Sequence, residues 1–420
     1  MKKELLESYK GVRDFYPEDQ FYLDYIKDVW SRVCESFGFE HYHASVLENA
    51  ELYKNKTSEE IVNEQTYIFE DRGGRQVVLR PEMTPTVTRM VAKKRRDFAY
   101  PLRLYSIPNV FRYERPQKGR LREHWQLNAD IFGAPGEFYE VELILLADSI
   151  MKEFGATQSD YVFKINSREE FDVIFNRLDL PDKLKAPVLR VMDKKDKLSE
   201  EEFRAELEKL LANKTGEFIL ALLDISKSEN LLGFKNKLEK LGVENIDIYP
   251  YLARGFDYYT GFIFEVFDTN KDNPRSLFGG GRYDNLMEKI GEEKLEALGF
   301  GMGDVSLLEF LKLRNLLPEY KPATDLAILT AGVSDALLYF AFDLSLQLRK
   351  YDIAVAINAN EQKLDKKIKG AEKLGIRFIS IVGESEIQNG ELNLKDLKTG
   401  KSYDRINIKE ISDIIFSSEI

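Results

Sequence analysis

The chain has few of the residues that form disulfides and transition-metal sites. It has 1 Cys and 3 His in 420 residues. Cys34 therefore cannot form an internal disulfide, and we expect it to be a small buried residue in a helical segment. Because His41, His43 and His124 have no partner at zinc-ligand spacing, we expect no transition-metal site.

Long hydrophobic runs and an excess of positive charge are also missing. No apolar run approaches the roughly 20 residues that a membrane span needs, and the opening MKKELLESYKGVRDF lacks the apolar block of a signal peptide. The net charge of −11 argues against indiscriminate binding to nucleic acid but leaves room for a local basic patch. We expect a cytoplasmic protein that does not contact membranes.

The length predicts two or three domains. From Asp325 onward, short β-rich runs alternate with amphipathic helices (DLAIL, DALLYFAFDLSLQLRK, IAVAIN, EQKLDKKIKGAEKLG, FISIVG), and a hairpin follows around Thr399. This order is typical of a small α/β domain with a largely parallel sheet. The preceding RNLLPEYKPATD is the predicted linker, so we place one domain at 1–320 and the other at 325–420.

Residues 165–245 have a helical pattern, and both Ser167…Glu170 and Ser199…Glu202 have the spacing of a capping box. The flanking regions have aromatic and β-branched strands with glycine-rich turns, such as PLRLYSI, QLNADIFG and SLFGGGRYDNL. Strands that stop for a helical block and then resume predict an antiparallel α+β core with a helical insertion.

The stretch NVFRYERPQKGRLREHWQLNADIFG, residues 109–133, concentrates basic residues in an acidic chain. It is predicted to be a strand, a turn at Pro116 and Gly119, and a returning strand. Gln126 and Asp130 are evenly spaced, so they share one strand face. Arg112 on the first strand would bind phosphate, while the amide and carboxylate would bind an amine or a ring N–H. A solvated charged loop is the alternative interpretation.

Two other clusters supply related chemistry. In LRPEMTPT, Glu82 and Thr84 alternate on one face beside Arg80. In LARGFDYYTGFIFEVF, Arg254 precedes a glycine and a pair of tyrosines, which could instead pack on the two sides of a sheet. TGKSY lacks the first glycine of a Walker loop, and FGGGRYD lacks the dinucleotide spacing, so any ATP site uses neither a P-loop nor a Rossmann turn.

Together these motifs resemble the histidyl-tRNA synthetases, a family of class II aminoacyl-tRNA synthetases. The resemblance follows the family's order over nearly the whole chain. It is carried by KGVRDFYP, TYIFEDRGGRQVVLRPEMTPTVTR, FRYERPQKGRLREHWQL, LARGFDYYTG, GGGRYDNL and NANEQKLDKKIKGAEKLGIRFISIVGESEIQNGELNLKDL, of which ERPQKGR and RGFDYY are highly specific. It implies a class II catalytic core followed by an anticodon-binding domain at 325–420.

The resemblance also implies a reaction, its substrates and its site residues. Histidine and ATP would give histidyl-adenylate, and the histidyl group would pass to the 3' end of its tRNA, with Mg²⁺ as cofactor and a homodimer as the assembly. Arg112 and Arg254 would be catalytic, at the α-phosphate of ATP. The implied histidine-binding residues are Glu82, Met83, Thr84, Gln126, Asp130, Tyr258, Tyr259 and Tyr283, and the implied ATP-binding residues are Arg112, Glu114, Arg120, His124 and Arg254.

Further contacts are implied for the two RNA-facing regions. The loop Arg115–Arg122 would close over ATP and meet the tRNA acceptor end. In the C-terminal domain, contact with tRNA would come from local cations, although these could equally form a solvated helix face: Lys363, Lys366, Lys367 and Arg377.

The chain departs from the family pattern at a few positions. Ser306 stands where the third motif usually has an arginine for the γ-phosphate, so that Arg120 or Arg275 is a candidate replacement. Asp130 stands where many members have the longer Glu, and His124 where another aromatic is common. The family motifs identify no metal ligand.

Two other functions compete with the synthetase interpretation. One is a synthetase-like regulatory subunit of ATP phosphoribosyltransferase, without catalysis. Such proteins typically lack the terminal domain and an intact histidine signature. This chain has both, with LARGFDYYTG as the signature. The other is an RNA-binding or translation-control module built on the same core, which the absence of a basic extension disfavours.

Overall fold

The computed structural model describes residues 6–53, 65–114, 120–254 and 258–417. Contacts between residues divide the chain into two compact units. The first contains residues 1–15 and 22–318, and the second contains residues 16–21 and 319–420. Within the described ranges, no helix is both long and apolar enough to cross a membrane.

A large sheet forms the centre of the first unit. It is 9-stranded, in the order β1-β5-β7-β12-β11-β10-β8-β9, with β6 paired to β7. The strands are β1 (Glu40–His41), β5 (Leu102–Ser106), β6 (Asn109–Phe111), β7 (Glu123–Phe132), β8 (Tyr161–Ser167), β9 (Ile246–Ile248), β10 (Phe262–Asp268), β11 (Ser276–Arg282) and β12 (Ala297–Gly303). All pairs from β5 to β8 are antiparallel, which confirms the predicted α+β core.

Three helices bury their apolar sides in the same hydrophobic cluster as this sheet: α1 (Pro17–Ser36), α4 (Phe138–Glu153) and α11 (Asp304–Leu313). The contribution of α4 comes from residues such as Leu143, Ile144 and Ala147, all fully buried. Cys34 of α1 is buried in this cluster too, and burial raises the pKa of its thiol well above the usual range. It is therefore the inert core residue that the sequence predicted.

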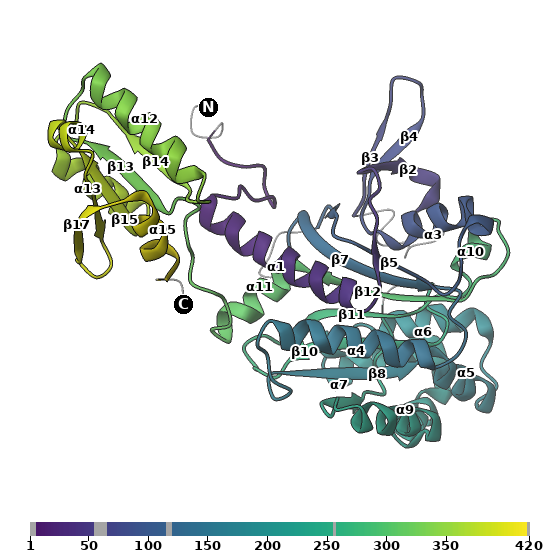
Figure 1. Ribbon diagram of the computed structural model, residues 1–420. Coiled ribbons are helices and arrows are strands. Elements are labelled where there is room, and N and C mark those ends of the chain that lie inside the picture. The colour runs from purple at the N-terminus through teal and green to yellow at the C-terminus, as the bar shows by residue number, and fades with distance from the viewer. Residues whose placement is uncertain (1–5, 54–64, 115–119, 255–257, 418–420) are drawn as a thin grey trace. The chain divides into compact units, whose positions relative to one another are not determined.

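The predicted helical insertion is confirmed between β8 and β9. Its helices are α5 (Arg168–Arg177), α6 (Lys185–Met192), α7 (Glu200–Leu211), α8 (Thr215–Asp224) and α9 (Glu229–Lys240), drawn in teal in Figure 1. Ser199 and Glu202 form the expected capping box. The prediction of a second box was wrong: Ser167 caps α5 through the N–H of Glu169, while Glu170 accepts a bond from Ser228 at 2.5 Å.

A smaller structure adjoins the large sheet and supports the start of helix α3 (Thr84–Lys93). It contains a 3-stranded sheet in the order β2-β4-β3 and the short helix α10. Their bounds are β2 (Leu47–Asn49), β3 (Tyr67–Glu70), β4 (Gln76–Leu79) and α10 (Leu286–Lys289). Val87 and Val91 of α3 share a hydrophobic cluster with Tyr258, Tyr283 and Leu286. This packing positions the segment between β4 and α3 beside those tyrosines.

The second unit has a 5-stranded sheet in the order β14-β13-β15-β16-β17. Its elements are β13 (Leu326–Thr330), α12 (Asp335–Arg349), β14 (Val355–Asn358), α13 (Leu364–Lys373), β15 (Phe378–Val382), α14 (Glu384–Asn389), β16 (Leu392–Asp396), β17 (Ser402–Ile406) and α15 (Ile408–Ser417). The first three strands are parallel and the last two form an antiparallel hairpin. The predicted α/β pattern is therefore confirmed.

Candidate active site

Residues from distant parts of the first unit surround one small cavity of about 40 Å³. They come from the start of α3 and the segment before it, from the end of β6 and from β7, from the connection between β9 and β10 that contains Arg254, and from β11 and β12. The lining residues are Glu82, Thr84, Arg112, Gln126, Asn128, Arg254, Tyr258, Tyr259, Gly279, Tyr283, Gly299, Phe300 and Gly301. Most of the predicted histidine-binding residues thus meet at one place. Two of them do not line the cavity: Met83, buried at the N-terminus of α3, and Asp130, buried on β7 and bonded to Tyr283, which does line it.

The strand pair β6 and β7 supplies the first polar groups. The backbone N–H of Arg112 donates to the carbonyl of Arg122, the residue before β7, at 2.9 Å. The guanidinium Nε of Arg112 donates to the carbonyl of Pro81 at 2.9 Å. These bonds orient the Arg112 guanidinium towards the cavity that it lines. The predicted turn at Pro116 and Gly119 lies outside the described residues, as does part of the loop 115–122.

Two glycines on β12 make room for the β7 side chains. A Cβ atom on Gly299 would collide with the carboxylate of Asp130, and one on Gly301 would collide with the amide of Gln126. Gln126 and Asp130 therefore lie on the same face of the sheet, as their even spacing predicted. Sequence reasoning missed these glycines, because the need for them comes from the neighbouring strand and not from local turn geometry.

Asp130 is a buried carboxylate with capacity for a further hydrogen bond. It is 1 % exposed, and the hydroxyl of Tyr283 donates to its Oδ1. Its Oδ2 atom is buried without a hydrogen-bond partner among the described residues. Burial, reinforced by the charge of Glu82, raises the pKa of Asp130 to about 7, against the opposing effect of the Tyr283 bond. Oδ2 can therefore accept a ligand N–H.

Three tyrosine rings pack together next to this carboxylate. Tyr258 and Tyr259 have ring centroids 4.9 Å apart, and Tyr258 packs edge-on to Tyr283 at 5.8 Å. The hydroxyl of Tyr258 donates to Glu82 Oε2 at 2.9 Å. The tyrosine pair therefore does not simply pack on either side of a sheet. Instead Tyr258 bonds Glu82 and packs against Tyr283, which bonds Asp130, so that two carboxylates and three aromatic rings lie together, an arrangement that suits a planar ring bearing N–H groups.

Arg254 is one of the residues that line the cavity. Its guanidinium Nη1 donates to the carbonyl of Phe264 at 3.1 Å and lies 3.6 Å from the carboxylate of Glu265. A Cβ atom on Gly279 would collide with this guanidinium. Burial lowers the pKa of Arg254, but Tyr259 and Glu265 outweigh it and raise the pKa above its usual value. The cation is thus permanent, and the absence of a side chain at Gly279 leaves room for it.

The other predicted ATP-binding residues lie along the same strand pair. Glu114 and Arg120 form an ion pair at 3.1 Å, with the Arg120 side chain half exposed. His124 is on β7, and burial together with the cations Arg112 and Arg13 lowers its pKa to about 3. The His124 ring is therefore neutral at physiological pH.

Two expectations for individual residues were wrong. Arg80 does not take part in the site: it is 0 % exposed, and its guanidinium donates to the backbone carbonyls of Ala44, Ser45 and Asn109. Glu82 lies between β4 and α3 and Thr84 is the first residue of α3, so they do not alternate along a strand. Ser306 donates to the carbonyl of Leu277 at 2.7 Å and thereby fastens α11 to β11.

A contact that sequence reasoning missed joins the N-terminal KGVRDF segment to α11. Arg13 pairs with Asp304 at 2.6 Å, and Asp304 also accepts from the N–H of Trp125 at 2.9 Å. Asp304 is 2 % exposed. The pair therefore fixes the N-terminal segment against β7 near His124.

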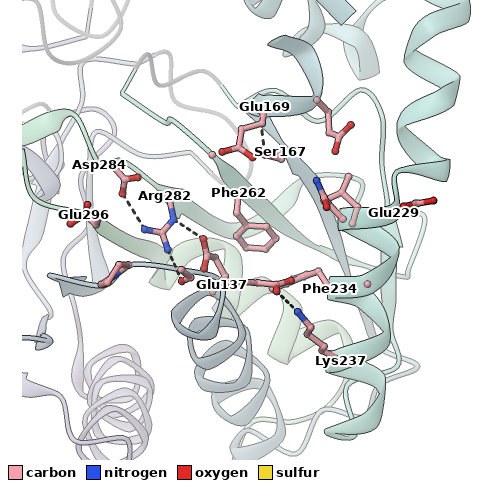
Figure 2. A pocket seen from close by; sticks show the side chains of 18 residues that line it. Glu137, Ser167, Glu169, Glu229, Phe234, Lys237, Phe262, Arg282, Asp284 and Glu296 are labelled. Atoms are coloured by element: carbon pink, nitrogen blue, oxygen red, sulfur yellow. Dashed lines mark hydrogen bonds and ion pairs between the residues drawn. The ribbon is translucent and has the colours of Figure 1, made fainter. Parts of the chain in front are cut away.

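A larger cavity in the first unit lies elsewhere. It has a volume of about 680 Å³ and lies between the insertion helices α5 and α9 and the ends of β10 and β11. Figure 2 shows Arg282 bonded to Asp284, and Lys237 bonded to Glu137. Arg282 also bonds Glu140. Arg282 and Lys237, which line this cavity, are thus paired with protein carboxylates, so the cavity is poorly suited to phosphate.

The antiparallel sheet, with arginines and a carboxylate-lined pocket on one face and an α/β unit at the C-terminus, defines a class II aminoacyl-tRNA synthetase. A family model described as histidyl-tRNA synthetase matches residues 11–305, and one described as anticodon binding domain matches residues 325–417. The chain belongs to the histidyl-tRNA synthetase family.

Curated relatives extend over almost the full length. The histidine–tRNA ligase of Leptospira biflexa is 41 % identical and covers 96 % of this chain and 96 % of its own. That of Pyrococcus horikoshii is 33 % identical and covers 97 % of this chain and 98 % of its own. The match therefore includes both the catalytic and the C-terminal regions.

Solved structures share the fold. The histidyl-tRNA synthetase of Nostoc sp. PCC 7120 has a TM-score of 0.78 at 24 % identity, covering 98 % of this chain and 99 % of its own. A Bacillus halodurans protein described as ATP phosphoribosyltransferase regulatory subunit/histidyl-tRNA synthetase has a TM-score of 0.72 at 21 % identity, covering 90 % and 98 %. At such identities the likeness concerns the fold alone, so the choice of function depends on the site and on the curated relatives.

Proposed function

We propose that this protein is a histidine–tRNA ligase, which activates L-histidine with ATP and transfers it to the 3' end of its tRNA. The observation that carries the proposal is the buried carboxylate of Asp130. Its Oδ1 accepts from the hydroxyl of Tyr283, which lines the cavity together with Arg112 and Arg254, and its Oδ2 has no hydrogen-bond partner among the described residues. An amino acid with a ring N–H and a nucleotide with an α-phosphate can meet there.

The histidine-binding roles follow from the chemistry of the lining. Oδ2 of Asp130 accepts the imidazole N–H, and the rings of Tyr258 and Tyr283 enclose the imidazole. The α-amine is bound by the acceptors Glu82, Thr84 and Gln126, all of which line the cavity. Tyr259 closes the pocket on the side of Arg254. The Arg254 guanidinium lies over the Tyr259 ring, 5.4 Å from its centroid. Met83 supports the pocket from behind.

The ATP-binding roles use the cations and the neutral ring. Arg112 and Arg254 bind the α-phosphate, and His124 stacks on adenine without adding charge. Glu114 and Arg120 contact the nucleotide from the start of the loop. Among the described residues, no three metal-ligating side chains lie together. We therefore propose that Mg²⁺ is bound largely through the ATP phosphates, with at most one or two protein carboxylates, as is usual for this ion.

The first step needs no protein base, because the α-carboxylate of histidine is ionised at neutral pH. A carboxylate oxygen attacks the α-phosphorus, the bond to the bridging oxygen of the β-phosphate breaks, and pyrophosphate leaves. Arg112 and Arg254 neutralise the charge on the α-phosphoryl oxygens. In the second step a ribose hydroxyl of the tRNA attacks the histidyl carbonyl carbon, its proton passes to a phosphate oxygen of the adenylate, and AMP leaves with the electron pair of the broken carbon–oxygen bond.

The deciding experiment is histidine-dependent exchange of pyrophosphate into ATP. A ligase catalyses it without tRNA, whereas a regulatory subunit of ATP phosphoribosyltransferase or a translation-control module does not. The buried pocket supports the ligase, since its carboxylates and arginines are preorganised around one cavity. No exchange by the folded wild-type protein would contradict the proposal.

Replacement of Asp130 by asparagine tests the imidazole contact. We expect Asp130→Asn to raise the KM for histidine by about 10-fold or more and to change the KM for ATP by less than about twofold, because a hydrogen-bonding site discriminates through the groups it pairs. Steady-state exchange kinetics measure both constants, and Glu114→Gln is a control at the nucleotide end. Equal effects of Asp130→Asn on both substrates would remove Asp130 from the side-chain pocket.

The pH dependence of histidine use tests the same group in the wild-type protein. Because the pKa of Asp130 is raised to about 7, its acceptor form is lost as the pH falls below 7. We expect kcat/KM for histidine to fall below pH 7, and more steeply than in Asp130→Asn, where only the substrate imidazole titrates, near pH 6.5. Identical profiles for the two proteins would contradict this assignment.

Assembly, domains and location are further parts of the proposal. We propose a homodimer, as the family resemblance implies, with a catalytic region at 1–320, its insertion at 165–245, and an anticodon-binding region at 325–420. We also propose a cytoplasmic location, supported by a single cysteine, Cys34, that is buried and unpaired in the described structure. One relative, from Arabidopsis thaliana, is a chloroplastic/mitochondrial ligase that is 33 % identical.

A further inference from the structure

We infer that Arg168, the first residue of the helical insertion's α5, is a positioning residue that fixes the backbone of the catalytic Arg254. This inference deepens the proposed function and rests on it. The guanidinium Nη2 of Arg168 donates to the backbone carbonyl of Arg254 at 2.8 Å, although the two residues are 86 positions apart in the chain. A charged donor on a carbonyl gives a stronger bond than a neutral donor does.

The backbone of Arg254 needs such support. Its φ angle is +55°, in the left-handed region that residues with a Cβ atom rarely adopt. A backbone of this kind persists only where the surroundings hold it, and it is characteristic of functional sites. Arg168 bonds the carbonyl that ends this residue. It therefore holds the point from which the Arg254 side chain projects into the cavity.

Arg168 itself is tied to the catalytic sheet. Its N–H donates to the carbonyl of Gly261 at 2.9 Å, and the preceding residue, Ser167, pairs with Phe262 across β8 and β10. Figure 2 shows Ser167 and Glu169, the two neighbours of Arg168, at the start of α5 beside Phe262. The same strand β10 carries the Phe264 carbonyl that accepts from Arg254. Backbone and side chain of Arg254 are thus held from one rigid strand.

This arrangement predicts an effect on turnover and not on histidine affinity. Arg168 does not line the small cavity, so it acts through Arg254. The Arg254 guanidinium lines the cavity, and a fixed backbone limits the positions that it can take there. Without the Arg168 bond the guanidinium would reach the α-phosphate in fewer of its orientations, and a misplacement of about 1 Å can reduce a rate about 10²-fold.

The test compares Arg168→Ala with Arg177→Ala. Arg177 is on the same helix and forms a half-exposed ion pair with Asp224 at 3.2 Å, so it is a matched control. In pyrophosphate exchange we expect Arg168→Ala to lower kcat by about 10- to 100-fold with the KM for histidine within about twofold. Arg168→Lys retains a charged donor and should recover part of kcat. It also carries the same test if Arg168→Ala does not fold.

Two further measurements separate positioning from other roles. In an Arg254→Ala background, Arg168→Ala should lower kcat no further, because the group that it positions is gone. In hydrogen exchange, the peptide containing Arg254 should exchange faster in Arg168→Ala than in Arg177→Ala or wild type. An unchanged kcat, an equal fall in both backgrounds, or a raised histidine KM would overturn the inference. Absence of exchange activity in wild type would overturn the proposed function instead, while the hydrogen-exchange result would still report on Arg168.

Discussion

Arg254→Ala is expected to lower the rate of histidyl-adenylate formation by about 10³–10⁵-fold, the range found when an arginine that stabilises a phosphoryl transition state is removed. The Arg254 cation is buried and permanently charged, and it lies in the cavity that also contains Arg112. Its contact with the α-phosphate strengthens as charge builds up in the transition state. The loss should therefore be in kcat, with histidine affinity nearly unchanged.

Pyrophosphate exchange and histidine binding by calorimetry measure these two quantities separately. Arg254→Lys keeps the charge but loses the planar pair of donors, so it should retain only part of the rate. Arg204→Ala, which removes a surface pair with Glu208 at 3.4 Å, is the control and should behave as wild type. An Arg254→Ala protein with an undiminished exchange rate would exclude the catalytic role.

The two variants Arg254→Ala and Arg168→Ala differ in what they remove. Arg254→Ala removes the charge itself, whereas Arg168→Ala leaves the charge but frees its backbone. The expected losses rank accordingly, with the larger one for the residue that contacts phosphate. The φ angle of Arg254, +55°, is strained for a residue with a Cβ atom, and the hydrogen bond from Arg168 helps to hold the backbone in this conformation. Such strain is common where a side chain must be presented to a reacting group.

Features with a local cause could be predicted from the sequence. The alternating strands and helices of 325–420 follow from hydrophobic periodicity, and the structure reproduces them in order. The common face of Gln126 and Asp130 follows from the two-residue period of a strand, and the β12 glycines confirm it. The Ser199–Glu202 capping box is equally local.

Features that depend on distant partners could not be predicted in this way. Arg80 stands in the sequence beside Glu82 and Thr84, but three backbone carbonyls from other segments use its donors. Glu170 had capping-box spacing, yet Ser228 of α9's N-terminus competes for its carboxylate. Arg168 carried no sequence signal at all, since its partner is 86 residues away. The chain folds these residues into place through long-range packing, which periodicity does not reveal.

The C-terminal region gives the other large expected effect, on transfer to tRNA. Its hydrophobic core is built from its own residues, including Leu326, Ile328, Leu344 and Phe378. Two of the cations predicted to contact tRNA are already occupied: Lys367 is 1 % exposed and donates to Thr330, and Arg377 pairs with Asp396 at 2.9 Å. Lys363 and Lys366 are exposed, so they are the two of these cations that we expect to contact RNA.

We expect a chain that ends after Pro322 to keep pyrophosphate exchange within a few-fold of wild type, because the cavity residues and their sheet all precede this point. Charging of tRNA should fall by at least about 10²-fold and should no longer respond to changes in the anticodon, since single-stranded RNA is recognised base by base.

The full-length double variant Lys363→Glu and Lys366→Glu is the matched test: its added negative charge should weaken charging while exchange stays normal. Circular dichroism and sedimentation establish that the shortened chain is folded and in its native assembly. If such a chain charged tRNA as well as the intact protein, and both responded equally to an anticodon change, residues 325–420 would have another role.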